Sequence, residues 1–179
     1  MHKLVSDRII LIDPGSVQIS ELVRFRRSNR DHLQPWEPLR NEFYSEQGVE
    51  HQLRELSTQV SSCAAMHWFL QLKDDDTVVG TCSFNNIMMG PFQACNLGFS
   101  LDHQHQRKGF MHEALTFAIE HAFAAKATHR IMANYRPENI RSENLLIKLG
   151  FVREGYARSY LKINGKWEDH ILTSLIRDI

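Results

Sequence analysis

The loop at 102–108, which ends in Gln106-Arg107-Lys108, joins an apolar strand-like run at 97–101 to a strongly patterned helical segment that begins at Gly109. The apolar residues of that segment recur at the i, i+3, i+4, i+7 spacing of a helix with one buried face. They are Met111, Ala114, Leu115, Ala118, Ile119, Ala122 and Phe123. The start of such a helix offers unpaired backbone N–H groups and a partial positive charge, so it attracts anions.

Two cations and a glycine strengthen this interpretation. Arg107 and Lys108 stand beside the expected helix start, and Gly109 has no side chain that would block the backbone. The junction therefore predicts a site for a pyrophosphate-bearing ligand. A solvated turn with two surface cations is the alternative.

Charge and hydrophobicity exclude several kinds of partner. The 179-residue chain has 21 Lys and Arg against 21 Asp and Glu, so no bulk attraction to nucleic acid or an anionic membrane is expected. We expect no sequence-specific nucleic-acid binding and no membrane span, because no run approaches the roughly 18–20 apolar residues that a span needs. The arginine-rich segment Arg24–Arg30 indicates a solvated helix face, with a contact to ribosomal RNA or an acidic partner as the alternative.

The cysteines and histidines indicate compartment and metal content. Cys63, Cys82 and Cys95 are an odd number without a Cys-x-x-Cys pair, which predicts buried free thiols in a reducing, cytoplasmic environment. The pair His103-x-His105 and the cluster at 168–170 lack the spaced partners of a zinc site. We expect no metal.

Periodicity and turn signals predict one α+β domain. Strands are expected at 8–13, 67–72, 78–86, 94–101 and 130–135, with two more in a hairpin around Asn164-Gly165. Helices are expected near 19–23, from an N-cap at Ser45, from Gly109, and from Asn139 to a C′ residue at Gly150. The segment Asn29–Asn41 contains two prolines and predicts an irregular loop. The result is a twisted, mixed antiparallel and parallel sheet with helices on both faces.

This order of elements, with a Gln/Arg-x-x-Gly-x-Gly/Ala loop after an antiparallel meander, resembles the GNAT (GCN5-related N-acetyltransferase) superfamily. In that family the loop amides hold the pyrophosphate of acetyl-coenzyme A. The chain matches at Gln106 and Gly109. It departs at Met111, where the family has a small residue, and at Arg107, where many relatives have glycine. The resemblance implies a single N-acetyltransferase domain over residues 1–179 with acetyl-CoA as cosubstrate.

Further motifs narrow the resemblance. The pattern Asn139-x-x-Ser142-x-x-Leu145-Leu146 is characteristic of the Rim-type enzymes, which acetylate protein N-termini. Residues 29–38, 129–135 and 155–170 are similar to the RimJ-type ribosomal-protein-alanine acetyltransferases. The similarity implies an acyltransferase that modifies the N-terminal alanine of a ribosomal protein of the small subunit.

The resemblance also implies roles for individual residues. Ser142 would donate a hydrogen bond to the leaving thiolate, because Leu146 stands where the superfamily has its tyrosine acid. The alternative is that the Ser142 hydroxyl bonds the backbone at the start of its own helix. The expected cofactor-binding residues are Phe99, Ser100, Leu101, Gln106, Arg107, Lys108, Gly109, Phe110, Met111 and Asn139, and Asn139 has a second role as helix N-cap. Residue types alone, without the resemblance, suggest Trp36, Glu37 and Asn85 as substrate-binding residues; the alternatives are a core residue under the loop for Trp36 and a surface charge for Glu37. His67, Asn85 and Asn86 are candidates for a water chain to the amine.

The chemistry of acyl transfer favours an α-amine as acceptor. An α-amine with a pKa of about 7.7–8.0 is neutral at pH 7 roughly 250 times more often than a lysine with a pKa of about 10.4, an advantage of about 3 kcal/mol. The sequence shows no obvious buried base, which suits the α-amine better. Two alternatives stay open: an acetyltransferase for a small-molecule amine, and a non-catalytic module that binds coenzyme A or the assembling ribosome.

Overall fold

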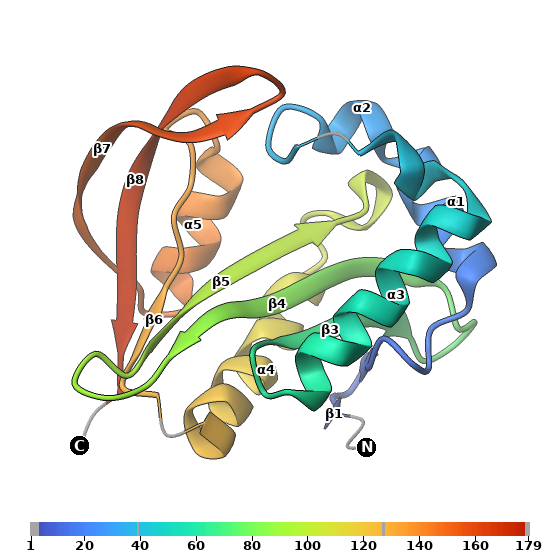
Figure 1. Ribbon diagram of the computed structural model, residues 1–179, viewed down its shortest axis with the longest axis horizontal. Helices are drawn as coiled ribbons and strands as arrows, with labels where there is room; N and C mark the ends of the chain where they lie inside the picture. The colour runs from blue at the N-terminus through green and yellow to red at the C-terminus, as the bar shows by residue number, and fades with distance from the viewer. Residues whose placement is uncertain (1–3, 39, 127, 178–179) are drawn as a thin grey trace.

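The computed structural model describes residues 4–38, 40–126 and 128–177. Within these ranges one sheet holds eight strands in the order β1-β2-β3-β4-β5-β6-β8-β7 (Figure 1). The strands are β1 (Leu4–Val5), β2 (Ile9–Ile12), β3 (Met66–Leu72), β4 (Val78–Met88), β5 (Ala94–Leu101), β6 (Arg130–Met132), β7 (Val152–Ile163) and β8 (Lys166–Ile176). β5 and β6 run parallel and the other neighbours are antiparallel. The sheet is therefore mixed, as predicted.

Helices cover both faces of this sheet (Figure 1). They are α1 (Ile19–Ser28), α2 (Arg30–Leu33), α3 (Glu46–Ser61), α4 (Phe110–Lys126) and α5 (Ile140–Lys148), with short 3₁₀ helices η1 (Asn41–Tyr44) and η2 (His103–His105). The predicted apolar stripe of α4 packs on one face with Phe84 and Leu97, and α1 and α3 pack on the other with Phe69. None of the described helices is long and apolar enough to span a membrane.

Three predicted local signals are confirmed. Ser45 caps α3, where its Oγ accepts a hydrogen bond of 3.1 Å from the Gly48 N–H. Gly150 follows α5 with φ +85°, the left-handed conformation of a C′ residue. Asn164 and Gly165 both have positive φ, as a two-residue type I′ turn requires, and they connect β7 to β8.

The predicted strand at 130–135 was too long. β6 ends at Met132, and Tyr135 forms only an isolated bridge with Ile171. Side chains interrupt the ladder between them, because the Thr173 N–H donates to Asn134 Oδ1 instead of to a backbone carbonyl.

Two further expectations need correction, and some short elements were not predicted. The irregular loop at 29–41 contains one helical turn, α2, in the four residues that follow Asn29 and precede its first proline. The strand β1 and the short η2 had no sequence signal, because each has three residues or fewer. Cys82 and Cys95 are buried free thiols, but Cys63 is exposed.

Candidate active site

β5 and β6 separate after three paired positions, and this separation exposes part of the β5 backbone. Their register pairs are Ala94 with Arg130, Cys95 with Ile131, and Asn96 with Met132; beyond Asn96 no described strand pairs with this edge of β5. The Asp102 N–H donates to the Val79 carbonyl of β4 at 2.7 Å. Because backbone groups alternate along a strand, the Phe99 and Leu101 N–H groups point away from β4, toward the open edge.

Ser100 differs from its two neighbours. The same alternation directs its backbone N–H toward β4, and its hydroxyl lies 3.0 Å from that of Thr81 on β4. Among the three predicted cofactor-binding residues of β5, Phe99 and Leu101 thus present free backbone donors, while Ser100 belongs to the polar surface of the sheet.

At the end of β5, residues 106–109 adopt a backbone suited to an anion. Arg107 and Gly109 have φ values of +61° and +83°. The Gly109 carbonyl accepts from the Glu113 N–H at 3.0 Å, so the N–H groups of 109–112 precede the first intrahelical bond and are left for a ligand. The Arg107 and Lys108 side chains are exposed. Met111 instead buries its side chain in the core, so only its backbone can reach a ligand.

Arg8 supplies a third cation that the sequence did not indicate. Its Nη1 donates to the Lys108 carbonyl at 2.9 Å, and its guanidinium lies 4.6 Å from the centre of the Phe110 ring. An ion pair of 2.7 Å joins Arg8 to Glu113. Burial alone would raise the pKa of Glu113, but hydrogen bonds from Ser6 and Arg8 lower it. A charged pair therefore fixes the segment around Arg8 to the start of α4.

Asn29 connects the start of the loop that follows β5 to α1 through hydrogen bonds. It is fully buried; its Nδ2 donates to the Phe25 carbonyl (2.9 Å) and to Asp102 Oδ2 (3.0 Å). Its Oδ1 accepts from the His103 backbone N–H and from His103 Nδ1, both at 2.9 Å. Asp102 also accepts from the Gln104 N–H at 2.8 Å. Burial alone would raise the pKa of Asp102, but the bonds from Asn29 and Gln104 lower it, so the carboxylate stays charged.

Gln106 makes a second link between the loop and the helices. Its Nε2 lies 2.8 Å from His32 Nε2 on α2. An amide nitrogen can only donate, so His32 must accept and its ring is neutral. Burial, Arg141 and His103 all lower the pKa of His32, which favours that neutral form.

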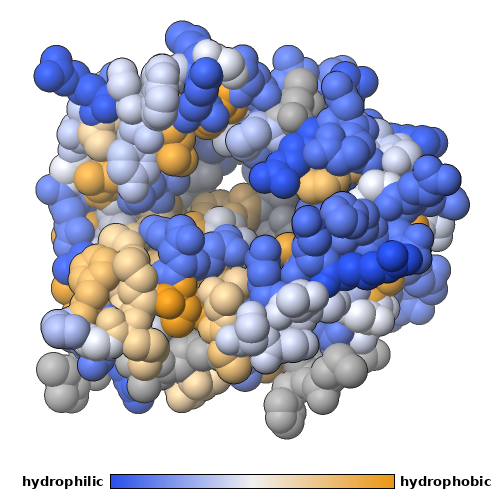
Figure 2. Space-filling view, in the orientation of Figure 1, coloured by the Kyte–Doolittle hydropathy of each residue, from blue (hydrophilic) through white to orange (hydrophobic). Residues whose placement is uncertain are grey.

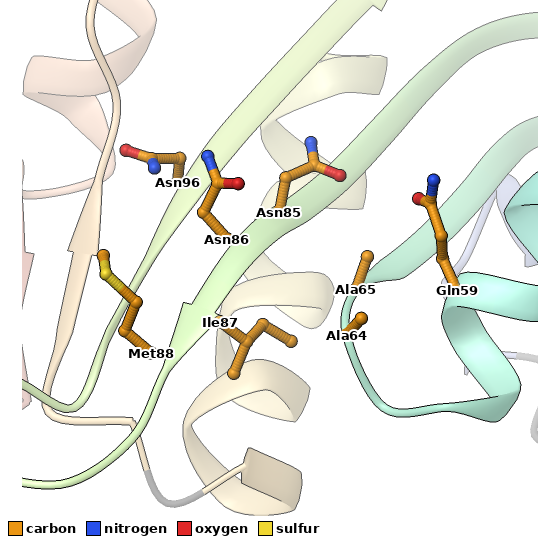
Figure 3. Close-up of a pocket in the computed structure, with 8 residues that line it drawn as sticks. All are labelled: Gln59, Ala64, Ala65, Asn85, Asn86, Ile87, Met88 and Asn96. Atoms are coloured by element: carbon orange, nitrogen blue, oxygen red, sulfur yellow. The ribbon is translucent and has the colours of Figure 1, made fainter.

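A pocket of about 780 Å³ opens on the α3 side of the sheet, at the other end of β5 (Figure 3). Its lining comprises four carboxamides and four apolar side chains: Gln59, Asn85, Asn86, Asn96, Ala64, Ala65, Ile87 and Met88. Asn85 and Asn96 are cross-strand partners of β4 and β5. Figure 2 shows this face of the molecule hollowed near its centre, with hydrophilic residues around the rim.

The structure separates the three predicted substrate-binding residues. Asn85 lines the 780 Å³ pocket, but Trp36 and Glu37 do not. They lie on the loop after α2, where Arg136 Nη1 donates to the Pro35 carbonyl at 2.7 Å and the Arg136 guanidinium lies 5.6 Å from the Trp36 ring centre. Burial raises the pKa of Glu37, and Arg26 opposes that rise.

Arg26 lines a smaller pocket of about 170 Å³, together with His67, Thr81 and Ser83. Burial lowers the pKa of His67 to about 4, and its Nε2 lies 3.1 Å from Gln59 Oε1. His67 is therefore neutral at pH 7 and a weak base. The His67 ring can take part in a water chain, but its affinity for a proton is low.

Asn139 and Ser142 lie at the start of α5. Asn139 is the N-cap of the helix, because its Oδ1 accepts from the Ser142 N–H at 3.2 Å. The Ser142 hydroxyl has no hydrogen-bond partner within the described part of the chain, so it does not bond its own helix start. Leu146, at the superfamily's tyrosine position, is 2% exposed and packs in the core.

The arginines of the segment Arg24–Arg30 all contact other parts of the protein. Each guanidinium has a partner within the protein: Arg24 bonds Glu21 and the Val78 carbonyl, Arg26 lies over Phe43, Arg27 bonds the Tyr44 carbonyl, and Arg30 lies over the Tyr44 ring. A ribosomal contact through this segment stays a prediction. The described residues contain no group of three or more His, Cys, Asp or Glu side chains that would hold a metal ion.

Comparison with known proteins agrees with this arrangement. Residues 8–152 match the model of an acetyltransferase (GNAT) domain, and the chain belongs to that family. It is 39% identical to the [ribosomal protein uS5]-alanine N-acetyltransferase of Escherichia coli, over 97% of this chain and 90% of the relative. The predicted GNAT fold and the predicted N-acetyltransferase class are confirmed.

Two solved structures are similar over most of their length. The ribosomal-protein-S5-alanine acetyltransferase of Vibrio fischeri is 38% identical with a TM-score of 0.91, covering 99% of this chain and 98% of that one. RimJ of Mycobacterium smegmatis, solved in complex with CoA-disulfide, is 26% identical with a TM-score of 0.85, covering 94% and 81%.

We predict that Gly109→Val weakens acetyl-CoA binding roughly 100-fold, measured by calorimetry, because two charge-assisted amide contacts to phosphate would be lost. Valine at φ +83° is strained and would displace the amides that begin α4. Gly90→Val is the matched control: Gly90 also has positive φ, +74°, but lies in open space in the turn between β4 and β5. Unchanged affinity in a folded Gly109→Val protein would contradict the phosphate site.

A second prediction concerns pH. Because the pKa of His67 in the folded protein, about 4, lies below its ordinary value, the associated stability is present above about pH 6.5 and is lost as pH falls toward 4. Full burial would make this worth about 3 kcal/mol, and partial exposure reduces it to roughly 1–2 kcal/mol. His67→Gln should lose correspondingly less free energy of unfolding between about pH 7 and about pH 4.5.

Denaturant melts at both pH values measure this difference. His51→Gln, at an exposed position on α3, is the control for replacing a histidine that is not buried. An equal pH dependence in His67→Gln and the parent protein would show that the His67 ring is not held neutral by burial.

Proposed function

We propose that the protein transfers the acetyl group of acetyl-CoA to the N-terminal alanine of small-subunit ribosomal protein uS5. The observation that carries the proposal is the extent of the match to the uS5-alanine acetyltransferase of Escherichia coli, which covers 97% of the chain. The match therefore extends beyond residues 8–152 into the β7–β8 hairpin. Asn164 at the tip of that hairpin donates to the Gln34 carbonyl at 2.8 Å, beside Trp36. The proposal treats residues 1–179 as one acetyltransferase domain and implies a cytoplasmic enzyme.

The residues of the loop and of β5 fit coenzyme A. The pyrophosphate would meet the N–H groups of 109–112, with Gln106, Arg107, Lys108 and Arg8 around it. The amide-bearing arm of coenzyme A would extend along the open edge of β5, where the Phe99 and Leu101 N–H groups are free to pair with an extended ligand. Acetyl-CoA supplies the activated thioester. A backbone N–H at this edge would polarise the thioester carbonyl, as an oxyanion site does.

Ser142 is our candidate for stabilising the leaving thiolate. Its hydroxyl is half-buried, has no partner among the described residues, and lies in the first turn of α5. A thiol has a pKa of about 8.5, so a single hydrogen bond to the developing thiolate is a useful contribution. Asn139 holds Ser142 in place by capping the same turn, and it is also our candidate for a cofactor contact.

The acceptor side of the site suits a neutral amine. The large pocket has no charged side chain among its described lining residues, and His67 next to it is a weak base. An α-amine is already partly neutral near pH 7, so it depends less than a lysine does on a base in the protein to remove its proton. We propose that Asn85 contacts the substrate from the floor of the cleft, and that Trp36 and Glu37 do so from the loop after α2.

Ser142→Ala should lower turnover roughly 10- to 100-fold and leave acetyl-CoA affinity nearly unchanged, because the lost bond acts on charge that develops in the transition state. Steady-state rates and thermal melts of the same preparations measure the two effects. A variant that loses stability but keeps its turnover per folded molecule would show that the hydroxyl serves only the helix.

Substrate class is tested with peptides that begin with Ala, Ser, Thr or Met, a blocked peptide with an internal lysine, and spermidine as a small-molecule amine. We expect the alanine peptide of uS5 to be acetylated fastest and lysine to react at least roughly 250-fold more slowly, as the difference in amine pKa implies. Lysine acetylation at a comparable rate, or preference for spermidine, would overturn the proposal.

A further inference from the structure

The floor of the 780 Å³ pocket contains an irregularity in β4. The register between β4 and β5 shifts between Asn85 and Met88, which is a β-bulge, and Asn86 within it has a φ of +53°. A bulge re-aims the side chain it contains, and asparagine is among the few residues that tolerate this backbone conformation. In Figure 3 the carboxamides of Asn85, Asn86 and Asn96 lie side by side on the same side of the sheet.

These three carboxamides have unused hydrogen-bonding capacity. Within the described residues, Asn86 and Asn96 make no side-chain hydrogen bond, and Asn85 uses only its Nδ2, which donates to Ser83 Oγ at 2.9 Å. Each carboxamide offers two N–H donors and an oxygen acceptor. This row of three carboxamides (Asn85, Asn86 and Asn96) therefore presents both hydrogen-bond donors and acceptors to a ligand in the pocket.

The chemistry of the pocket selects a neutral ligand. None of its described lining residues carries a charge, so it offers no counter-ion to a phosphate, a polyamine or a metal. A peptide main chain is neutral and carries one N–H and one C=O per residue, which match the carboxamide row. The apolar side of the pocket, formed by Ile87, Met88 and two alanines, suits the side chains of such a peptide.

The position of the row fits the same occupant. Asn96 is the last residue of β5 that pairs with β6, so it stands where the open edge begins. A peptide whose amine reached the thioester at that edge would have its following residues over Asn85, Asn86 and Asn96.

We infer that the Asn85, Asn86 and Asn96 carboxamides bind the main chain of the acceptor residues that follow the acetylated one. This inference rests on the proposed function, because it assumes a peptide acceptor. The row would make the enzyme prefer a peptide over an amino-acid amide that carries the same α-amine.

The test measures kcat/KM for alanine amide, an alanyl dipeptide amide and an alanyl tetrapeptide amide, with acetyl-CoA saturating. The parent protein should gain activity with length. Asn96→Ala should reduce kcat/KM for the tetrapeptide roughly 5- to 10-fold and leave alanine amide nearly unchanged. Asn86→Gly, which suits the positive φ, should reduce kcat/KM for the tetrapeptide to a similar extent. Asn41→Ala, at an exposed position in η1 outside the pocket, is the control. The KM for acetyl-CoA should be the same in all four proteins.

Each other outcome overturns the inference in a recognisable way. If kcat/KM falls equally for alanine amide and for the tetrapeptide, the carboxamides act at the amine or stabilise the fold, and do not bind the residues that follow. A parent protein without a length preference, or variants that keep it, would show that the row does not contact the peptide. If the parent protein acetylates none of the three alanine substrates, the proposed function fails together with the inference.

Discussion

The early separation of β5 from β6 determines the arrangement of the rest of the site. Parallel strands normally satisfy each other's backbone groups along their length, but here only three positions pair. The chain after β6 leaves β5 but stays beside β8, to which Ala133 and Tyr135 donate backbone hydrogen bonds. The free edge of β5 runs from the carboxamide pocket at Asn96 to the loop that precedes α4. One strand therefore connects the proposed acceptor pocket to the proposed pyrophosphate site.

An open strand edge and a glycine-containing loop would be mobile without support, and Asn29 supplies that support. Both of its N–H donors and both lone pairs of its oxygen are used, and it is fully buried. A polar network that is fully satisfied at low dielectric holds a single arrangement, whereas a partly satisfied one would be costly. Asn29 thereby fixes Asp102 and His103 against α1, and His32 fixes Gln106. Helices α1 and α2 and the loop at 102–106 are thus one hydrogen-bonded unit.

Features encoded within a few neighbouring residues were predictable from sequence. The α4 stripe, the Ser45 cap, Gly150 and the Asn164-Gly165 turn each depend on local spacing, and the structure has all of them. Arg8 was missed because its partners lie about a hundred residues away and only the fold brings them together. The Asn86 side chain could not be placed either, since its direction depends on a bulge that is defined by the partner strand.

The charges of the site are distributed in a way that suits its two ligands. Arg8, Arg107 and Lys108 lie at the end of β5 where a pyrophosphate would bind, and the pocket near Asn96 is uncharged. Leu101 lies five positions after Asn96 along β5, a distance of roughly 17 Å. That exceeds the screening length of about 8 Å at physiological ionic strength, and bound phosphates would neutralise the cations further. A peptide with a cationic N-terminus would therefore meet no repulsion from the loop as it approaches over the pocket, and no described lining residue of the pocket carries a counter-charge that would hold its amine protonated.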